Sequence, residues 1–190
     1  MYYNLIASAE ESTVLAQYVR EERAPYGSYQ SEEALERALI RLLEEEGYAY
    51  LPIHDEAELI ANLRTQLAAL NGYDFTDAEW ERFFNTSIAP ASDGIAAKTR
   101  RIQTDYIQNL RRDDGTTKNI RLIDKDNIHN NRLQVIHQYA VEGGAGAGEN
   151  AAAHANRYDV TILVNGLPLV HLELKRRGVE IRQAFNQIKR

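Results

Sequence analysis

The stretch RYDVTILVNGLPLVHLELKRR, residues 157–177, predicts two apolar strands joined by a tight turn at Asn165–Gly166. Charged residues stand at the open end of this hairpin. Asp159 begins the first strand, and Glu173 and Lys175 end the second. Charged side chains are seldom buried without partners, because an unpaired charge in an apolar interior is strongly unfavourable. The stretch therefore requires a partner or ligand that compensates these charges.

The register of the hairpin decides whether these charges meet. Alternation along a strand puts Glu173 and Lys175 on one face, roughly 6.6 Å apart, and directs Leu172 and Leu174 toward the expected core. A two-residue turn would place Asp159 opposite Leu172, on the wrong face. A three-residue loop or a β-bulge would place it opposite Glu173. If the charges form one site, we predict the longer loop or a bulge.

Two carboxylates and an ammonium group at this spacing suit a hard divalent cation. Mg²⁺ binds through one or two carboxylates, keeps several waters and accepts substrate phosphate. Such an ion polarises a phosphorus centre and activates water, while Lys175 would orient that water or neutralise developing charge. The structural alternative is a plain Glu–Lys pair on an exposed strand face, and the pattern by itself leaves it open.

Length and composition indicate an ordinary globular protein. The chain has 190 residues, 44% apolar and 26% charged, which suits one sizeable domain. It has no cysteine, so disulfides and thiolate metal sites are excluded. No apolar run approaches the roughly 18 residues of a membrane helix, and the start lacks the pattern of a signal peptide. We expect a soluble cytoplasmic protein without a membrane contact.

Charge is divided unevenly along the chain. Residues 1–90 carry 6 basic and 17 acidic residues, whereas residues 91–190 carry 16 basic and 11 acidic ones. A polyanion such as DNA could meet the second half while the first half faces elsewhere. Partitioning of charge without a function explains the asymmetry equally well.

Periodicity and capping signals predict an α/β order of elements. The expected strands comprise 47–53, 117–125, 131–142 and the hairpin 158–175, with a loop at 143–150, and the expected helices comprise 31–46, 55–70, a short one from Thr76 and a last one from about Val179. Residues 1–30 and 91–116 receive no functional interpretation. The chain ends inside the last helix without a stop signal, so we expect a fragment of a longer protein.

The charged hairpin resembles a known nuclease pattern. Asp159, a gap of thirteen residues and then Glu173-Leu174-Lys175 resembles the PD-(D/E)xK nuclease superfamily, with Tyr158 where the proline usually stands. The longer string RYDVTILVNGLPLVHLELK is similar to the N-terminal nuclease domain of the restriction (R) subunit of type I restriction endonucleases, in which the NGLPL turn is characteristic. Residues 131–143, NRLQVIHQYAVEG, also resemble that family.

Two further positions follow from resemblance. In the R-subunit family a glutamine in the next helix precedes a tyrosine by four residues; Gln187 matches by its distance from Glu173, and Gln183 matches less well. The tyrosine would fall just after Arg190. The first predicted helix resembles that of archaeal Holliday-junction resolvases, where a metal-binding glutamate lies eleven residues before a glycine, as Glu36 does before Gly47. A solvated helix face is the alternative for Glu36.

The resemblance implies a fold, a reaction and partners. The fold is a mixed central β-sheet flanked by helices, forming one nuclease domain over residues 1–190 of a longer, helicase-containing subunit. The reaction is hydrolysis of phosphodiesters in double-stranded DNA with Mg²⁺, or Mn²⁺ as substitute. The implied partners are the methyltransferase and specificity subunits, within whose complex family members cleave. The sequence has no GxxxxGK[ST] motif, so ATP is expected to act only through motor domains absent from this chain.

The resemblance also implies roles for individual residues. The metal ligands are Asp159, Glu173, the backbone carbonyl of Leu174, and Glu36. Lys175 assists the attacking water, and Gln187 helps to position Lys175 or phosphate.

Other interpretations remain open. The chain could be a non-catalytic docking module of the same complex, with the acidic first half and the aromatic residues Trp80, Phe83 and Phe84 contacting a partner, although such aromatics are more often core. It could also be a junction-resolvase-like nuclease that acts alone. His171 could touch the site or be structural. The basic residues after the motif could contact DNA phosphates or form a solvated helix face: Arg176, Arg177, Arg182, Lys189 and Arg190.

Overall fold

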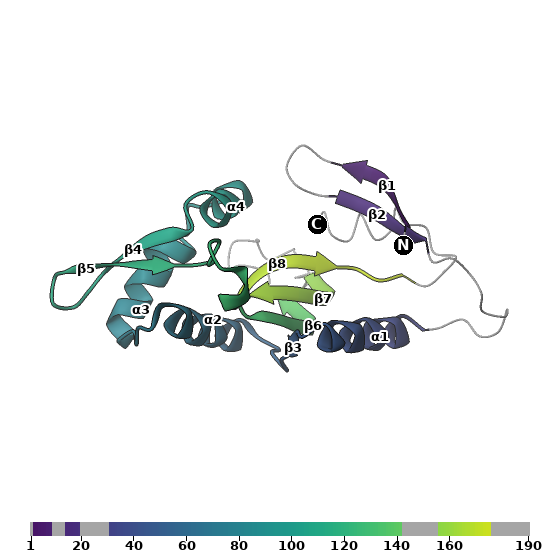
Figure 1. The fold of residues 1–190 in the computed structure, drawn as a ribbon, viewed down its shortest axis with the longest axis horizontal. Coiled ribbons are helices and arrows are strands. Elements are labelled where there is room, and N and C mark those ends of the chain that lie inside the picture. Colours follow the sequence, from purple (N-terminus) through teal and green to yellow (C-terminus); the bar gives the residue numbers. More distant parts are fainter. Residues whose placement is uncertain (1, 9–13, 20–30, 142–155, 176–190) are drawn as a thin grey trace, which may run out of the picture.

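A computed structural model describes residues 2–8, 14–19, 31–141 and 156–175 (Figure 1). The helices are α1 (Glu32–Glu45), α2 (Glu56–Asn71), α3 (Asp77–Phe83) and α4 (Ile95–Gln103), with a π-helical turn at Phe84–Ile88 and a 3₁₀ turn at Ile128–Asn130. The strands are β1 (Tyr2–Ser8), β2 (Val14–Val19), β3 (Ala49–Tyr50), β4 (Ile107–Arg111), β5 (Thr117–Arg121), β6 (Leu133–Val141), β7 (Asn156–Val164) and β8 (Leu167–Leu172). Within these ranges no helix combines the length and apolarity needed to cross a membrane.

The main sheet is mixed, as predicted. Its strands follow the order β3-β6-β7-β8, with β3 parallel to β6 and the other pairs antiparallel. The hairpins β1–β2 and β4–β5 form separate two-stranded sheets. In Figure 1, α1 lies by one end of the main sheet, and α3, α4 and the β4–β5 hairpin lie together beyond the other end.

Local signals explain the first two helices. The Ser31 side chain accepts a hydrogen bond from the Ala34 N–H at 3.2 Å and so caps α1, as predicted. The Asp55 carboxylate caps α2 in the same way through the Glu58 N–H at 2.8 Å. The strand predicted over 47–53 is wrong in extent, because only Ala49 and Tyr50 pair with β6. Pro52, which has no N–H to donate, follows almost at once.

Two apolar clusters lie on opposite faces of the main sheet. Val135 and Val160 pack with Ile40 of α1, whereas the next residue of β6, Ile136, packs with Ile53 and Leu163. Because successive side chains on a strand point to opposite faces, the two clusters are separated by the sheet. The α1 cluster also contains partly buried residues of β8 and beyond, Leu172 and Leu174.

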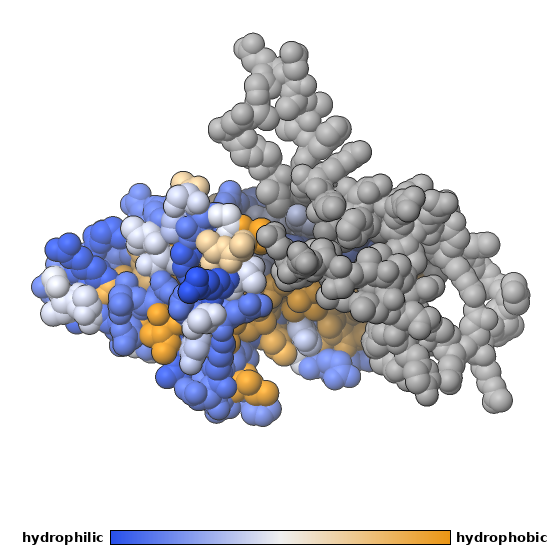
Figure 2. Space-filling model, turned by 90° about the horizontal axis from the view of Figure 1, so that it is seen from above, coloured by the Kyte–Doolittle hydropathy of each residue, from blue (hydrophilic) through white to orange (hydrophobic). Residues whose placement is uncertain are grey.

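A third cluster forms around α2, α3 and the β4–β5 hairpin. Leu67 of α2, Leu110 of β4 and Ile120 of β5 are all at most 1% exposed, and the aromatic side chains of α3 pack against them. Trp80 is 7% and Phe83 2% exposed, so both belong to the core rather than to a partner surface. Residues 91–116 contribute α4 and β4, which the sequence did not indicate. The end of the molecule that carries α3 and β4–β5 is mainly hydrophilic in the view of Figure 2.

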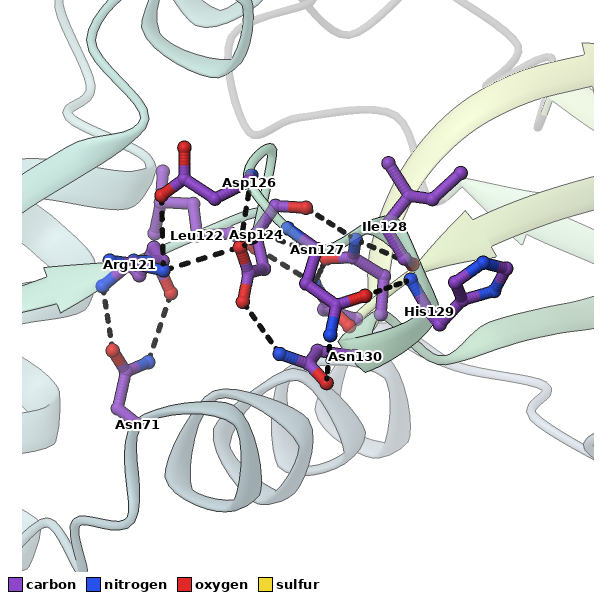
Figure 3. Close-up of polar contacts among 11 residues, drawn as sticks. Asn71, Arg121, Leu122, Asp124, Asp126, Asn127, Ile128, His129 and Asn130 are labelled. Atoms are coloured by element: carbon purple, nitrogen blue, oxygen red, sulfur yellow. Dashed lines mark hydrogen bonds and ion pairs between the residues drawn. The ribbon is translucent and has the colours of Figure 1, made fainter.

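The loop between β5 and β6 is held by its own polar side chains (Figure 3). The buried Asp124 carboxylate accepts hydrogen bonds from the backbone N–H groups of Asp126 and Asn127 and from the Asn130 side chain, at 2.8–3.1 Å. These hydrogen bonds hold the pKa of Asp124 below its usual value. The Asn71 amide pairs with both backbone groups of Arg121, which ties β5 to α2. The loop therefore fixes where β6 begins.

The Asn165–Gly166 turn joins β7 to β8 and docks on this loop. Both residues have positive φ, 51° and 81°, the pattern of a type I′ hairpin turn. Asn165 is 1% exposed, and its side chain accepts from the Arg132 N–H at 2.8 Å and donates to the Leu122 carbonyl at 3.1 Å. A Cβ at Gly166 would lie 2.6 Å from the Leu63 Cα in α2. Backbone atoms cannot yield as a side chain can, so only glycine fits here.

We predict that Gly166→Ala destabilises the fold by about 2–4 kcal/mol, because positive φ and a backbone clash act together. Gly115→Ala is a matched control, since Gly115 has φ 84° but no neighbouring atom within 4 Å of the place that a Cβ would take. Urea unfolding of both variants measures the difference. Equal losses for the two substitutions would contradict the proposed contact with α2.

Candidate active site

The hairpin brings Asp159 to the position opposite Glu173. The turn has two residues, since Val164 pairs with Leu167, but the register then shifts between Ile162 and Leu163. This shift is a β-bulge, and beyond it Val160 pairs with Leu172. The same register continued by one residue sets Asp159 opposite Glu173. The predicted bulge is therefore present.

The Asp159 carboxylate is fixed by the strand end that carries Glu173. Its Oδ2 accepts a hydrogen bond from the backbone N–H of Leu174 at 2.7 Å. Leu174 packs on the other side, in the α1 cluster with Leu172, as alternation predicted. The backbone thus holds the carboxylate while the apolar neighbours anchor the strand.

Lys175 forms an ion pair with Glu173 and lies near a second carboxylate. Its Nζ is 2.5 Å from Glu173 Oε1 and 3.9 Å from Glu32 Oε2 in α1. The Glu173 side chain is only 3% exposed and that of Lys175 19%. The alternative of a Glu–Lys pair on an exposed strand face is therefore excluded, because both side chains are largely buried.

Burial and the neighbouring negative charges shift the pKa values of Glu173 and Lys175. Burial raises the pKa of the Glu173 carboxyl above its usual value; the Lys175 hydrogen bond opposes this shift, and the charges of Asp159 and Glu32 reinforce it. Burial lowers the pKa of Lys175, but the hydrogen bond to Glu173 and the charges of Glu173, Glu32 and Asp159 outweigh it, and the pKa rises. Lys175 is therefore protonated and positively charged near neutral pH.

Glu36 lies on α1 one turn after Glu32. It is 5% exposed, which excludes the alternative of a solvated helix face. Its Oε2 accepts a hydrogen bond from the side chain of Gln138 in β6 at 2.6 Å. Its role as a metal ligand stays a prediction, as does that of the Leu174 carbonyl.

His171 occupies the face of β8 that carries Glu173 but bonds to its own hairpin. Its Nδ1 lies 2.9 Å from the Thr161 hydroxyl, and its ring stacks on Tyr158 with centroids 4.1 Å apart. Burial lowers its pKa. These contacts favour the structural role among the two that the sequence left open.

Several predicted features lie outside the described residues. They are Gln187 and Gln183, the loop 143–150, the last helix from about Val179, and the basic residues Arg176, Arg177, Arg182, Lys189 and Arg190. Their predicted roles stay predictions.

The donors of this site fit a hard divalent cation. Asp159 and Glu173 present carboxylate oxygens from neighbouring segments of the hairpin. Burial raises the pKa of Glu173 and the charges of Asp159 and Glu32 add to this, so a bound cation would favour the ionised form of Glu173. In the part of the chain that the structure describes, no three His, Cys, Asp or Glu side chains group closely enough to hold a metal. An ion here would therefore complete its shell with water and backbone oxygens, as Mg²⁺ commonly does.

The sequence did not indicate two residues of the site. Glu32 is an acidic residue in the first turn of α1, and its carboxylate approaches Lys175. Its spacing of four residues before Glu36 put both on one helix face and was the available signal. Gln138 had no signal, because nothing in a strand pattern marks a residue with positive φ.

Fold and site together define an α/β domain with a carboxylate–lysine cluster at the open end of a β-hairpin. The chain belongs to the family described as Type I restriction enzyme R protein N terminus, whose pattern matches residues 29–190.

The curated relatives that this chain matches are endonuclease subunits of type I restriction enzymes. The chain is 52% identical over 164 residues to the Type I restriction enzyme EcoprrI endonuclease subunit of Escherichia coli, a match that covers 86% of this chain and 50% of that protein. It is 41% identical over 169 residues to the SauMSSORF170P endonuclease subunit of Staphylococcus aureus strain MSSA476, covering 86% and 17%. The SsaAORF53P endonuclease subunit of Staphylococcus saprophyticus is 38% identical over 167 residues, covering 85% and 16%. The chain thus spans half or less of the relatives it matches.

We predict that the pKa of Glu173 responds to its two charged neighbours in opposite directions. Lys175→Met should raise it further and Glu32→Gln should lower it, whereas Glu33→Gln, on the exposed face of the same turn, should leave it unchanged. Carboxyl ¹³C NMR titration measures each value. Since the folded pKa lies above the unfolded one, the stability that Glu173 contributes is present at low pH and lost as pH rises through the folded pKa. A Glu173 carboxyl indifferent to both neighbours would contradict the described cluster.

Proposed function

We propose that this chain is the metal-dependent DNA endonuclease domain of a type I restriction enzyme R subunit, with a PD-(D/E)xK active site. The observation that carries the proposal is the convergence of Asp159, Glu173 and Lys175 at one end of the hairpin. Their order and spacing follow the nuclease pattern, and the family membership is that of restriction endonuclease subunits.

Asp159 and Glu173 would hold Mg²⁺ or Mn²⁺, with the Leu174 carbonyl as backbone ligand and water completing the shell. Glu36, the further carboxylate that the resemblance implies, accepts a hydrogen bond from Gln138 and does not group with these two carboxylates in the described residues. When bound, the ion would act as a Lewis acid on the phosphate and lower the pKa of a coordinated water. Lys175 would neutralise charge that develops on the phosphorus oxygens, because its raised pKa makes it a cation rather than a general base. Gln187 would help to position Lys175 or phosphate.

The substrate would be the backbone of double-stranded DNA. Sequence recognition would reside in a specificity subunit, and the methyltransferase subunit would complete the complex. ATP would act through motor domains of the longer subunit. This assignment is consistent with the positive balance of residues 91–190, since phosphate contacts supply affinity and little sequence information.

Glu173→Ala and Lys175→Ala, built into the longer R subunit and assembled with its partners, should each reduce DNA cleavage by roughly 1,000-fold or more. Removing an exposed charge elsewhere, in Glu33→Ala, should leave cleavage unchanged. Thermal unfolding of each variant checks that the fold is intact. Retained cleavage by either site variant in a clean preparation would rule out the assignment.

Metal titration separates this function from a non-catalytic docking module. Calorimetric titration of the chain with Mn²⁺ or Mg²⁺ should give a saturable signal that Asp159→Asn abolishes, and the ion should raise Tm only in the parent chain. Asp126→Asn, an acidic residue of the exposed β5–β6 loop, is the matched control. A signal that is absent, or that survives Asp159→Asn, would favour the docking module.

A further inference from the structure

Gln138 has an unusual backbone in the middle of a strand. Its φ is 57°, and the other described non-glycine residue with positive φ is Asn165 in the hairpin turn. Asparagine tolerates this conformation well, but glutamine in a strand does not, since the Cβ crowds the backbone. Such an outlier persists only where surrounding contacts hold it, and these positions gather at functional sites.

The outlier interrupts the ladder opposite Asp159. β6 and β7 pair through His137 with Val160 and through Tyr139 with Tyr158, in one unbroken register. The pair between them, Gln138 with Asp159, is missing. The interruption therefore falls on the strand position that faces a predicted metal ligand.

The positive φ of Gln138 also changes the face of the main sheet on which the side chains of Gln138 and Tyr139 lie. Gln138 lies three residues after Val135, so regular alternation would turn it away from α1. Its amide nonetheless donates to Glu36 of α1. Tyr139 would share the face of Val135, yet it packs with Ile136 and Leu163 on the opposite face. The conformation of Gln138 is thus what allows it to reach α1.

This hydrogen bond fixes the end of α1 that approaches the site. The bond joins residues 102 positions apart and is shielded by the burial of Glu36. Glu32 stands one turn before Glu36, so a helix held at Glu36 also sets the distance from Glu32 to Lys175, 3.9 Å. Among the acidic groups that act on Lys175 are Glu173, Glu32 and Asp159.

We propose that Gln138 is a positioning residue that holds α1 through Glu36, so that Glu32 serves as the second carboxylate partner of Lys175. The inference rests on the proposed function. Glu173 Oε1 is engaged by Lys175, so an ion that takes this oxygen competes with the ammonium group, and a second carboxylate acceptor eases that competition. Glu32 supplies that acceptor, and Gln138 keeps it within reach.

A double-mutant cycle tests the inference without metal. The coupling between Glu32→Gln and Lys175→Met is measured by urea unfolding in three backgrounds: the parent, Glu173→Gln and Gln138→Gly. In the Glu173→Gln background the coupling should increase and amount to a factor of about 2 to 5 in the folding equilibrium constant. The reason is that Lys175 then pairs with Glu32. In Gln138→Gly it should vanish, although glycine accepts the positive φ. Glu33→Gln in place of Glu32→Gln should show no coupling in any background.

A swap of the two partners tests the route through Glu36. Gln138→Glu alone should abolish the coupling between Glu32 and Lys175, since two carboxylates then face each other at positions 36 and 138. Adding Glu36→Gln should restore the coupling, because the hydrogen bond forms again with donor and acceptor exchanged. The Mn²⁺ affinity measured by calorimetry should change in parallel with the coupling. It should fall roughly 10-fold in Gln138→Gly and recover in the double variant Gln138→Glu/Glu36→Gln. Coupling that is unchanged in Gln138→Gly, or not restored by the swap, would overturn the role of Gln138. If the parent binds no Mn²⁺, the proposed function fails while the unfolding cycle still decides the role of Gln138.

Discussion

The register of the β7–β8 hairpin is the constraint on which the site depends. The side-chain period of a strand is two, so a shift of one residue exchanges the two faces. The two-residue turn by itself would set Asp159 against Leu172, and the bulge restores the pairing that sets it opposite Glu173. The turn is held by the buried Asn165 side chain and by the contact of Gly166 with α2. The hairpin is thus anchored at its closed end and carries the charges at its open end.

Electrostatics at the open end follow from this anchoring. The carboxylates of Glu173, Asp159 and Glu32 all act on the ammonium group of Lys175, so negative charge exceeds positive charge at a partly buried site. Burial, reinforced by the neighbouring carboxylates, raises the pKa of Glu173, while the same carboxylates raise the pKa of Lys175 and keep it charged. An arrangement of this kind is poorly suited to stability alone, since buried ion pairs seldom repay their desolvation. It is well suited to accepting a cation, which gives the nuclease proposal its physical basis.

Local signals predicted much of the fold. Ser31 caps the helix that the sequence assigned to it, the second predicted helix forms from Asp55, and Leu172 and Leu174 point to the core side of the hairpin, as alternation required. The predictions were wrong or missing where local signals are weak. The strand around Ala49 is short because Pro52 follows, and α4 has no side-chain cap at Gly94 that would announce it. The burial of Trp80 depends on strands contributed later in the chain.

The sequence by itself indicated a turn at Asn165–Gly166 and singled out Asp159, Glu173 and Lys175, because these lie on one hairpin and obey its short-range geometry. It left a longer loop or a bulge as the two ways to bring the charges together, and the structure has the bulge. Tertiary structure alone decided that Glu36 is buried against Gln138 and that Glu32 reaches Lys175. Those contacts join α1 to residues more than a hundred positions away, and one of them is made by Gln138, whose φ is positive. Residue type and spacing do not encode such a conformation, since packing partners from elsewhere in the chain must hold it in place.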